Sequence, residues 1–248
     1  MSAVITEQRG PVLWLTLNRP EARNAMSVDL LSALTTHVTA LASRPDVSVL
    51  VITGAGKSFC AGMDLKAVLD SPAQMGVLLH ALADLNLAIR ALPMVTLAKI
   101  NGAAIGGGCG LACVCDLAIT HADAKLGYPE VDLGVCPAVV APVLVRKIGA
   151  GRARRVLLTG GLMSGQQAFD LGLVDQVVPT GAELDAAAND LATRLAKGGP
   201  NALRATKDLL NTIDGSLDAT IAHRGADLSA KIVASPETQA ILRAKLGK

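Results

Sequence analysis

One stretch decides the fold class: residues 95–110, with the sequence VTLAKINGAAIGGGCG. Its first six residues are rich in Val, Ile and Thr, which predicts a strand. The glycines from Gly102 to Gly110 follow at once, and we expect them to open a helix. Glycine lets a substrate approach the backbone closely, and free amide groups at a helix N-terminus attract negative charge. The stretch therefore predicts a strand that leads into a helix through a candidate ligand-binding turn.

The surrounding sequence repeats this alternation of strand and helix. Residues 27–43 carry leucine and valine at helical spacing behind Ser27, a residue type that caps helices. A second helical pattern covers residues 73–92 and ends before Pro93. The other β-rich runs are residues 12–17 (VLWLTL), 47–53 (VSVLVIT) and 117–120 (LAIT). Such alternation is typical of α/β folds.

After about Gly134 we expect the strands to stop and helices to follow one another. Capping boxes at Ser164–Gln167 and Thr180–Glu183 predict two helix starts. Further helical patterns cover residues 137–148, 200–213 and 217–233. We therefore expect a core at residues 1–195 and a helical C-terminal region at residues 196–248. That region is rich in alanine and would be poorly stable alone, which favours packing on a neighbouring subunit.

The composition excludes several classes of protein. With 51% hydrophobic and 18% charged residues among 248, the chain is too apolar to be disordered. A net charge of +2 and an aromatic content of 2% do not suit a nucleic-acid-binding protein. No apolar run reaches the roughly 20 residues of a membrane span, and the N-terminal residues do not resemble a secretory signal. An odd count of five cysteines then indicates reduced thiols and a cytoplasmic protein.

Three glycine-containing segments are candidates for binding chemistry. Residues 54–58 (GAGKS) resemble a phosphate-binding loop, but Val51 stands where that loop needs its first glycine, so an NTPase is disfavoured. Residues 102–110 do not match a dinucleotide fingerprint in good register. Together with residues 59–65 (FCAGMDL), however, they form two turns that could aim two backbone N–H groups at one oxygen, as in an oxyanion hole. Close packing of a helix is the alternative explanation of residues 102–110. The pair Cys113 and Cys115 lacks further residues at metal-ligand spacing, so we expect no metal site.

Four segments resemble the crotonase (enoyl-CoA hydratase/isomerase) superfamily, in the order and spacing of that family. They are residues 17–27 (LNRPEARNAMS), 56–65 (GKSFCAGMDL), 100–109 (INGAAIGGGC) and 127–131 (GYPEV). The similarity extends over essentially the whole chain. It implies an α/β fold, a crotonase-like spiral of ββα units with a helical C-terminal region, and assembly as a homotrimer or a dimer of trimers.

The resemblance also implies a site. The family binds acyl-CoA thioesters and polarises the thioester oxygen with two backbone N–H groups, which here fall on Met63 and Gly107. Glu130 matches a family acid/base, and no cofactor is implied beyond CoA, which is part of the substrate. Substrate contacts are expected from the following motif residues: Arg23, Ala61, Asp64, Leu65, Lys66, Gly106 and Tyr128.

Residues outside these motifs are weaker candidates. Lys207, like Arg23 and Lys66, is a candidate for the CoA phosphates, although most surface cations meet only water. His80 falls on a helix whose family counterpart lines the acyl site, but a partly buried helix histidine is the simpler interpretation. A packed ring is likewise the simpler interpretation of Tyr128. Three cysteines flank the site without an evident base partner: Cys60, Cys109 and Cys136.

One position departs from the hydratases of the family. They carry two glutamates, and this chain has Gly110 where the first would stand. A general base contributes roughly 10²–10⁴-fold to a rate, so the loss weighs against hydration. We therefore expect Glu130 to act as a single acid/base and double-bond isomerisation to exceed hydration. The alternatives are a non-catalytic or weakly catalytic acyl-CoA-binding protein, and a true hydratase in which another acid, such as Asp132, replaces the missing glutamate.

Overall fold

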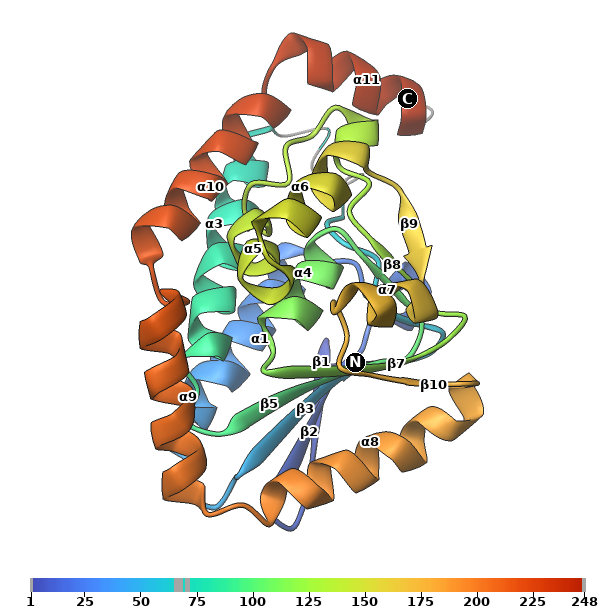
Figure 1. Cartoon of the computed structure of the whole chain (residues 1–248). Coiled ribbons are helices and arrows are strands. Elements are labelled where there is room, and N and C mark those ends of the chain that lie inside the picture. The colour runs from blue at the N-terminus through green and yellow to red at the C-terminus, as the bar shows by residue number, and fades with distance from the viewer. Residues whose placement is uncertain (1, 65–68, 70–71, 247–248) are drawn as a thin grey trace.

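The computed structural model describes residues 2–64, 69 and 72–246, and it contains two sheets (Figure 1). The larger sheet has six strands in the order β1-β2-β3-β5-β7-β10. Only β1 is antiparallel to its neighbour, and the other pairs are parallel. The strands are β1 (Val4–Arg9), β2 (Val12–Leu17), β3 (Val49–Gly54), β5 (Val95–Ile100), β7 (Leu117–His121) and β10 (Gln176–Val178).

A smaller sheet lies beside the first and carries the turns of interest. Its order is β4-β6-β8-β9, parallel except for the last pair. The strands are β4 (Ser58–Cys60), β6 (Ala103–Ile105), β8 (Lys125–Gly127) and β9 (Leu162–Ser164). Each of β3, β5 and β7 in the large sheet is followed along the chain by a strand of the small one. This repeat confirms the expected spiral of ββα units.

Helices cover both faces of the large sheet. Figure 1 shows α8 (Gly181–Ala196) alone beneath one face, where its Leu184 and Leu191 pack against β3 and β5. The opposite face is covered by α1 (Val28–Leu41), α3 (Pro72–Arg90) and α4 (Gly107–Val114). Because helices cover both faces of the sheet, all six residues of β3 (VLVITG) are buried. Its sequence therefore does not alternate between apolar and polar residues.

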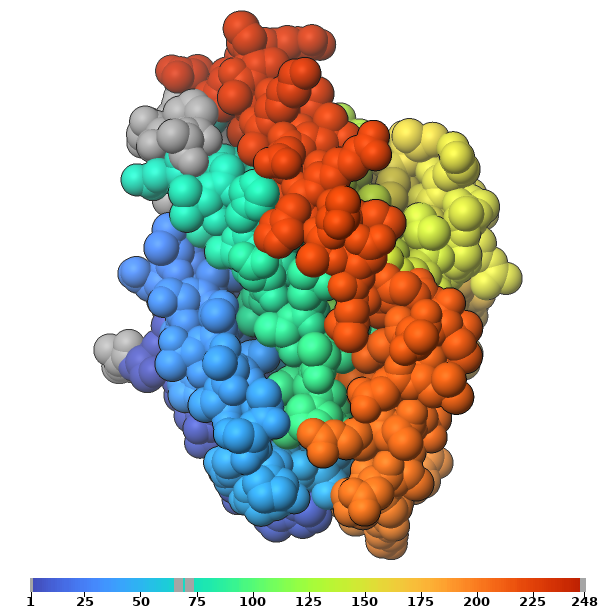
Figure 2. All heavy atoms as spheres, turned by 90° about the vertical axis from the view of Figure 1, so that its left-hand side faces the viewer, coloured from blue at the N-terminus to red at the C-terminus, as the bar shows by residue number. Residues whose placement is uncertain are grey.

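The remaining helices lie beside the small sheet and in the C-terminal part of the chain. They are α5 (Ala141–Ile148), α6 (Ala150–Thr159), α7 (Gly165–Leu171), α9 (Pro200–Asp214), α10 (Ala219–Val233) and α11 (Pro236–Leu246). Figure 2 shows α10 lying along α3, so that the end of the chain packs against its first half. No helix within the described residues has both the length and the apolar character that a bilayer crossing requires.

Most elements expected before Gly134 are confirmed. Ser27 caps α1 by accepting a hydrogen bond from the N–H of Leu30, and β5 has the bounds expected from its composition. The expectation that strands stop after Gly134 is wrong, because β9 and β10 each extend a sheet there. Both have only three residues, which is too short for an alternating pattern to appear in the sequence.

The two expected capping boxes have different outcomes. At Ser164 the box is complete, with Gln167 returning a hydrogen bond to the backbone of the cap. At Thr180 a helix does begin, but the hydroxyl donates to the Glu183 carboxylate at 2.9 Å instead of accepting from the backbone. The expected helix at residues 137–148 begins later, at Ala141.

Candidate active site

A cleft that is partly open to solvent lies between the small sheet, α3, α4 and α10. Its walls are mainly aliphatic. Side chains of α3 (Leu79 and Leu82), of α10 (Val233) and of the segment before α5 (Val139 and Val140) form most of them. Such a lining suits a hydrocarbon chain, and the polar groups that remain are few and localised.

Two glycine turns meet at one end of this cleft. Gly62 has a φ of +90° and Gly106 a φ of +55°, conformations that L side chains rarely adopt. A Cβ built on Gly62 would lie 2.8 Å from the carbonyl oxygen of Ile105 and 4.0 Å from the amide nitrogen of Gly107. Glycine at position 62 thus allows the backbone after β4 to contact the backbone after β6.

Met63 and Gly107 each follow directly after the glycine of one of these turns, and both residues line the cleft. Gly107 is the first residue of α4, where N–H groups have no partner inside the helix. Among the described residues, neither N–H group has a recorded hydrogen bond. The positive end of the α4 dipole adds to this environment. Two free donors on adjoining turns are the arrangement that stabilises an oxyanion.

Glu130 lies across the Gly106 turn, directly before the short 3₁₀ helix Val131–Leu133. A Cβ built on Gly106 would lie 2.7 Å from Oε1 of Glu130, so the carboxylate contacts the turn. The other oxygen, Oε2, is buried and has no hydrogen-bond partner among the described residues. Burial raises the pKa of Glu130 to about 7. A carboxylate in this state can both accept and return a proton near neutral pH.

The side chain of Val140 fills the space beside Gly110. Gly110 is buried in α4, and a Cβ built on it would overlap Cγ1 of Val140 and lie 3.1 Å from its Cβ. Asp132 does not supply the missing carboxylate, because it is exposed, lies outside the cleft lining, and accepts a hydrogen bond from the N–H of Gly161 at 2.8 Å. Among the described residues, Glu130 is the acid that lines the cleft.

The expected substrate contacts have different outcomes. Ala61 and Gly106 line the cleft. Tyr128 does not, since its ring is fully buried in the core and its hydroxyl donates to Sγ of Cys113 at 3.4 Å. Its expected role in the acyl pocket is therefore not supported, and the packed-ring alternative is. Leu65 and Lys66 lie outside the described residues.

Asp64 and Arg23 lie beside the Gly62 turn without lining the cleft. The Asp64 carboxylate lies 3.8 Å from the Arg19 guanidinium, and its backbone N–H donates to Met26. Arg23 is exposed, and its carbonyl accepts a hydrogen bond from Ala61 at 3.0 Å. Both residues thus help to hold the turn in place through these contacts.

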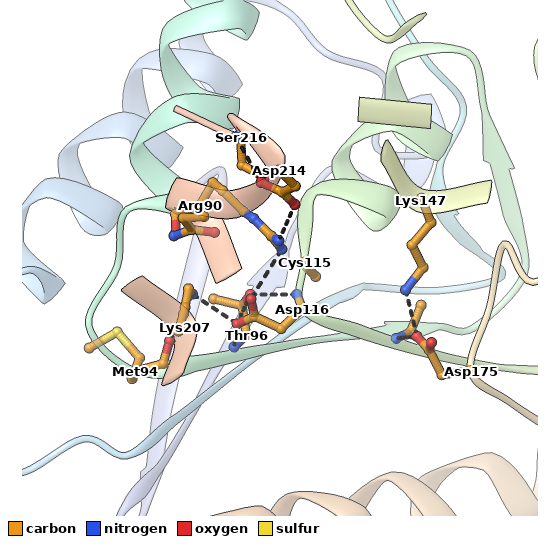
Figure 3. Close-up of polar contacts among 12 residues, drawn as sticks. Arg90, Met94, Thr96, Cys115, Asp116, Lys147, Asp175, Lys207, Asp214 and Ser216 are labelled. Atoms are coloured by element: carbon orange, nitrogen blue, oxygen red, sulfur yellow. Dashed lines mark hydrogen bonds and ion pairs between the residues drawn. The ribbon is translucent and has the colours of Figure 1, made fainter. Parts of the chain in front are cut away.

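Lys207 is not available to a CoA phosphate, which corrects the expectation from sequence. Only 6% of its side chain is exposed, and Nζ lies 2.8 Å from Oδ2 of Asp116 and 3.0 Å from the carbonyl oxygen of Met94 (Figure 3). Burial lowers the pKa of Lys207, and the charge of Asp116 opposes that shift. The residue fastens α9 to the start of β5.

His80 and two of the flanking cysteines also lie away from the cleft lining. His80 faces α10 from α3. Cys60 and Cys109 are fully buried, and burial raises the pKa of the Cys60 thiol to about 12, so a thiolate nucleophile is not formed there. Cys136 does line the cleft, and burial raises its pKa.

Comparison with known proteins finds relatives that cover most of the chain. Residues 7–240 match the model of a family described as enoyl-CoA hydratase/isomerase. A putative enoyl-CoA hydratase from Thermus thermophilus is 39% identical over 217 residues, which cover 86% of this chain and 85% of that protein. The 2,3-dehydroadipyl-CoA hydratase of Escherichia coli is 36% identical, with 85% and 82% covered. The crystal structure of an enoyl-CoA hydratase from Bacillus halodurans superposes with a TM-score of 0.90 at 26% identity, over 98% of this chain and 100% of that one.

Proposed function

Since the chain belongs to the enoyl-CoA hydratase/isomerase family of the crotonase superfamily, we propose that it moves a proton within an enoyl-CoA thioester, with Glu130 as the single acid/base. In this proposal, the double bond migrates between the 3-enoyl and 2-enoyl positions at a higher rate than the substrate is hydrated. The observation that carries the proposal is the buried Glu130 carboxylate, which has one oxygen without a partner and faces the turns of Met63 and Gly107.

The proposed reaction takes place in two proton transfers. Glu130 removes a proton from C2 of a 3-enoyl thioester, and the electrons move onto the thioester oxygen to give a dienolate. The N–H groups of Met63 and Gly107 stabilise the negative charge on that oxygen, where each preorganised donor is worth about 3–4 kcal/mol. Glu130 then returns the proton to C4, which leaves the double bond between C2 and C3. No cofactor beyond the CoA thioester takes part.

Position 110 supports the preference for isomerisation. Hydration needs a water molecule that is oriented, and a second carboxylate to share its proton. Val140, which lines the cleft and packs on Gly110, offers apolar methyl groups in place of that carboxylate. Proton transfer between C2 and C4 needs neither the water nor the second acid.

Hydration is the competing function, because the relatives named above are described as hydratases. The decisive experiment measures both reactions on one preparation: loss of 2-enoyl-CoA by hydration, and conversion of 3-enoyl-CoA to 2-enoyl-CoA at equal chain length. We expect isomerisation to be the faster reaction. Hydration at an enzymatic rate without isomerisation would refute the proposal, and tight binding without either reaction would indicate a binding protein.

The proposal extends to assembly as a homotrimer or a dimer of trimers. It is supported by large apolar side chains on α9 and α10 that are left exposed in the single chain. The most exposed of them are Leu209, Leu210 and Ile213 on α9, at 59%, 53% and 71%, and Ile221 and Leu228 on α10, at 46% and 47%. Sedimentation analysis of the purified protein tests this assembly directly.

A further inference from the structure

A second polar cluster lies outside the cleft, where α10 packs along α3 (Figure 2). Each helix carries a histidine and, four residues later, an aspartate: His80 and Asp84 on α3, and His223 and Asp227 on α10. Residues four apart share one face of a helix. The two pairs bond crosswise, with Nε2 of His80 3.0 Å from Oδ1 of Asp227 and Nε2 of His223 3.2 Å from Oδ1 of Asp84.

The two imidazole rings also meet each other. Their Nδ1 atoms are 3.1 Å apart, the ring centroids are 5.3 Å apart and the planes differ by 24°, so the rings meet edge to edge through these nitrogens. About two fifths of each side chain is exposed, at 39% for His80 and 40% for His223. Among the described residues, Asp84 and Asp227 are the charged side chains recorded in contact with the pair.

The hydrogen bonds determine how many protons the pair holds. A carboxylate only accepts, so each contact to an aspartate requires a proton on Nε2. The contact between the Nδ1 atoms requires exactly one more, because two lone pairs repel at that distance and two N–H groups clash. All three contacts are therefore satisfied by three protons on four ring nitrogens, which is one imidazolium beside one neutral imidazole.

We propose that His80 and His223 form a shared-proton clasp that fastens α10 to α3 while the pair carries a single positive charge. A second added proton places two N–H groups and two like charges face to face. Loss of the shared proton leaves two Nδ1 lone pairs facing each other at 3.1 Å. Gain or loss of a proton therefore removes about one hydrogen bond from the pair. This lowers the folding equilibrium constant roughly three- to tenfold.

The clasp connects two walls of the cleft. Leu79, the neighbour of His80, lines the cleft from α3, and Val233 lines it from α10. The inference concerns packing of the C-terminal helix, and it does not depend on which reaction Glu130 performs.

The test compares urea unfolding of three proteins between about pH 5 and pH 9, in buffers that contain EDTA: the wild type, the His80→Gln/His223→Gln variant and a His37→Gln control on α1. The measured ratio is the folding equilibrium constant of the wild type divided by that of the double variant. Plotted against pH, this ratio should pass through a maximum and fall about three- to tenfold on each side. The control should follow the wild type. Nitrogen NMR of the wild type at the maximum should show both Nε2 atoms protonated and one Nδ1 proton shared.

A ratio that does not change with pH would overturn the clasp, as would two neutral or two charged rings at the maximum. If the difference appears only when zinc replaces EDTA, a metal ion and not a proton joins the rings, and the proposal fails. Should the double histidine variant not fold, Asp84→Asn/Asp227→Asn provides a milder test. Asparagine keeps an acceptor oxygen but removes the charge that favours the imidazolium, so the maximum should move to lower pH.

Discussion

Asp116 and Glu130 are both acids held largely away from solvent, and their surroundings are opposite. Asp116 accepts from the N–H of Thr96 at 2.8 Å, from Nζ of Lys207 at 2.8 Å and from Arg90 at 3.1 Å (Figure 3). Glu130 leaves one carboxylate oxygen without a partner among the described residues. A buried acid with every partner in place holds a fold together, whereas one without partners is free to react.

The largest expected effect is on catalysis at Glu130. In Glu130→Gln the only proposed acid/base is lost while the shape of the side chain stays, so kcat for 3-enoyl-CoA conversion should fall by about 10³-fold. Acyl-CoA affinity, measured by calorimetry, should change by no more than a few fold. A variant with wild-type kcat would remove Glu130 from the mechanism.

The second prediction concerns Asp116, the acid whose partners are in place, and removes its charge. Asp116→Asn leaves Lys207 and Arg90 without their shared carboxylate, and we expect the free energy of unfolding to fall by about 3 kcal/mol. Asp214→Asn is the matched control, because the Asp214 carboxylate lies 3.5 Å from Arg90 and is more exposed. Urea unfolding of both variants tests the comparison, which fails if the control is destabilised as much as Asp116→Asn.

The third prediction concerns pH and stability. The folded-state pKa of Glu130 is about 7 against an ordinary 4.5. A raised pKa contributes stability that is fully present below about pH 4.5 and is lost as pH rises through about 7. Relative to Glu130→Gln, the wild type should therefore lose about 3 kcal/mol of unfolding free energy between these limits. Equal pH profiles for the two proteins would show that Glu130 is not held in a desolvating site.

The smallest effect is expected where a second acid is installed. Gly110→Glu alone should fold poorly, because its side chain meets Val140. Gly110→Glu combined with Val140→Gly makes room for the carboxylate, and 2-enoyl-CoA hydration should rise by about tenfold over Val140→Gly alone. Rates of hydration for the single and double variants measure this, and no gain in the folded double variant would show that position 110 does not control the reaction.

The parts of the site that follow from local sequence were predictable. The glycines at positions 62 and 106 mark the two turns, and Glu130 is found through its motif next to Pro129. Contacts between distant segments were not predictable in the same way. From the sequence, Lys207 is interpreted as a surface lysine. In the fold, α9 brings it against Asp116, which is 91 residues away in sequence. Val140 is an ordinary apolar residue in the sequence, and only packing brings it onto Gly110.

The contact between Gly110 and Val140 also constrains how this protein can change over evolutionary time. A side chain at position 110 collides with Cγ1 of the valine, so a second acid there is accommodated with least strain after a smaller residue has appeared at position 140. That first substitution opens a void in the core and brings no new chemistry with it. The contact therefore favours one order of the two mutations, and it works against a second acid at position 110 for as long as the valine is kept.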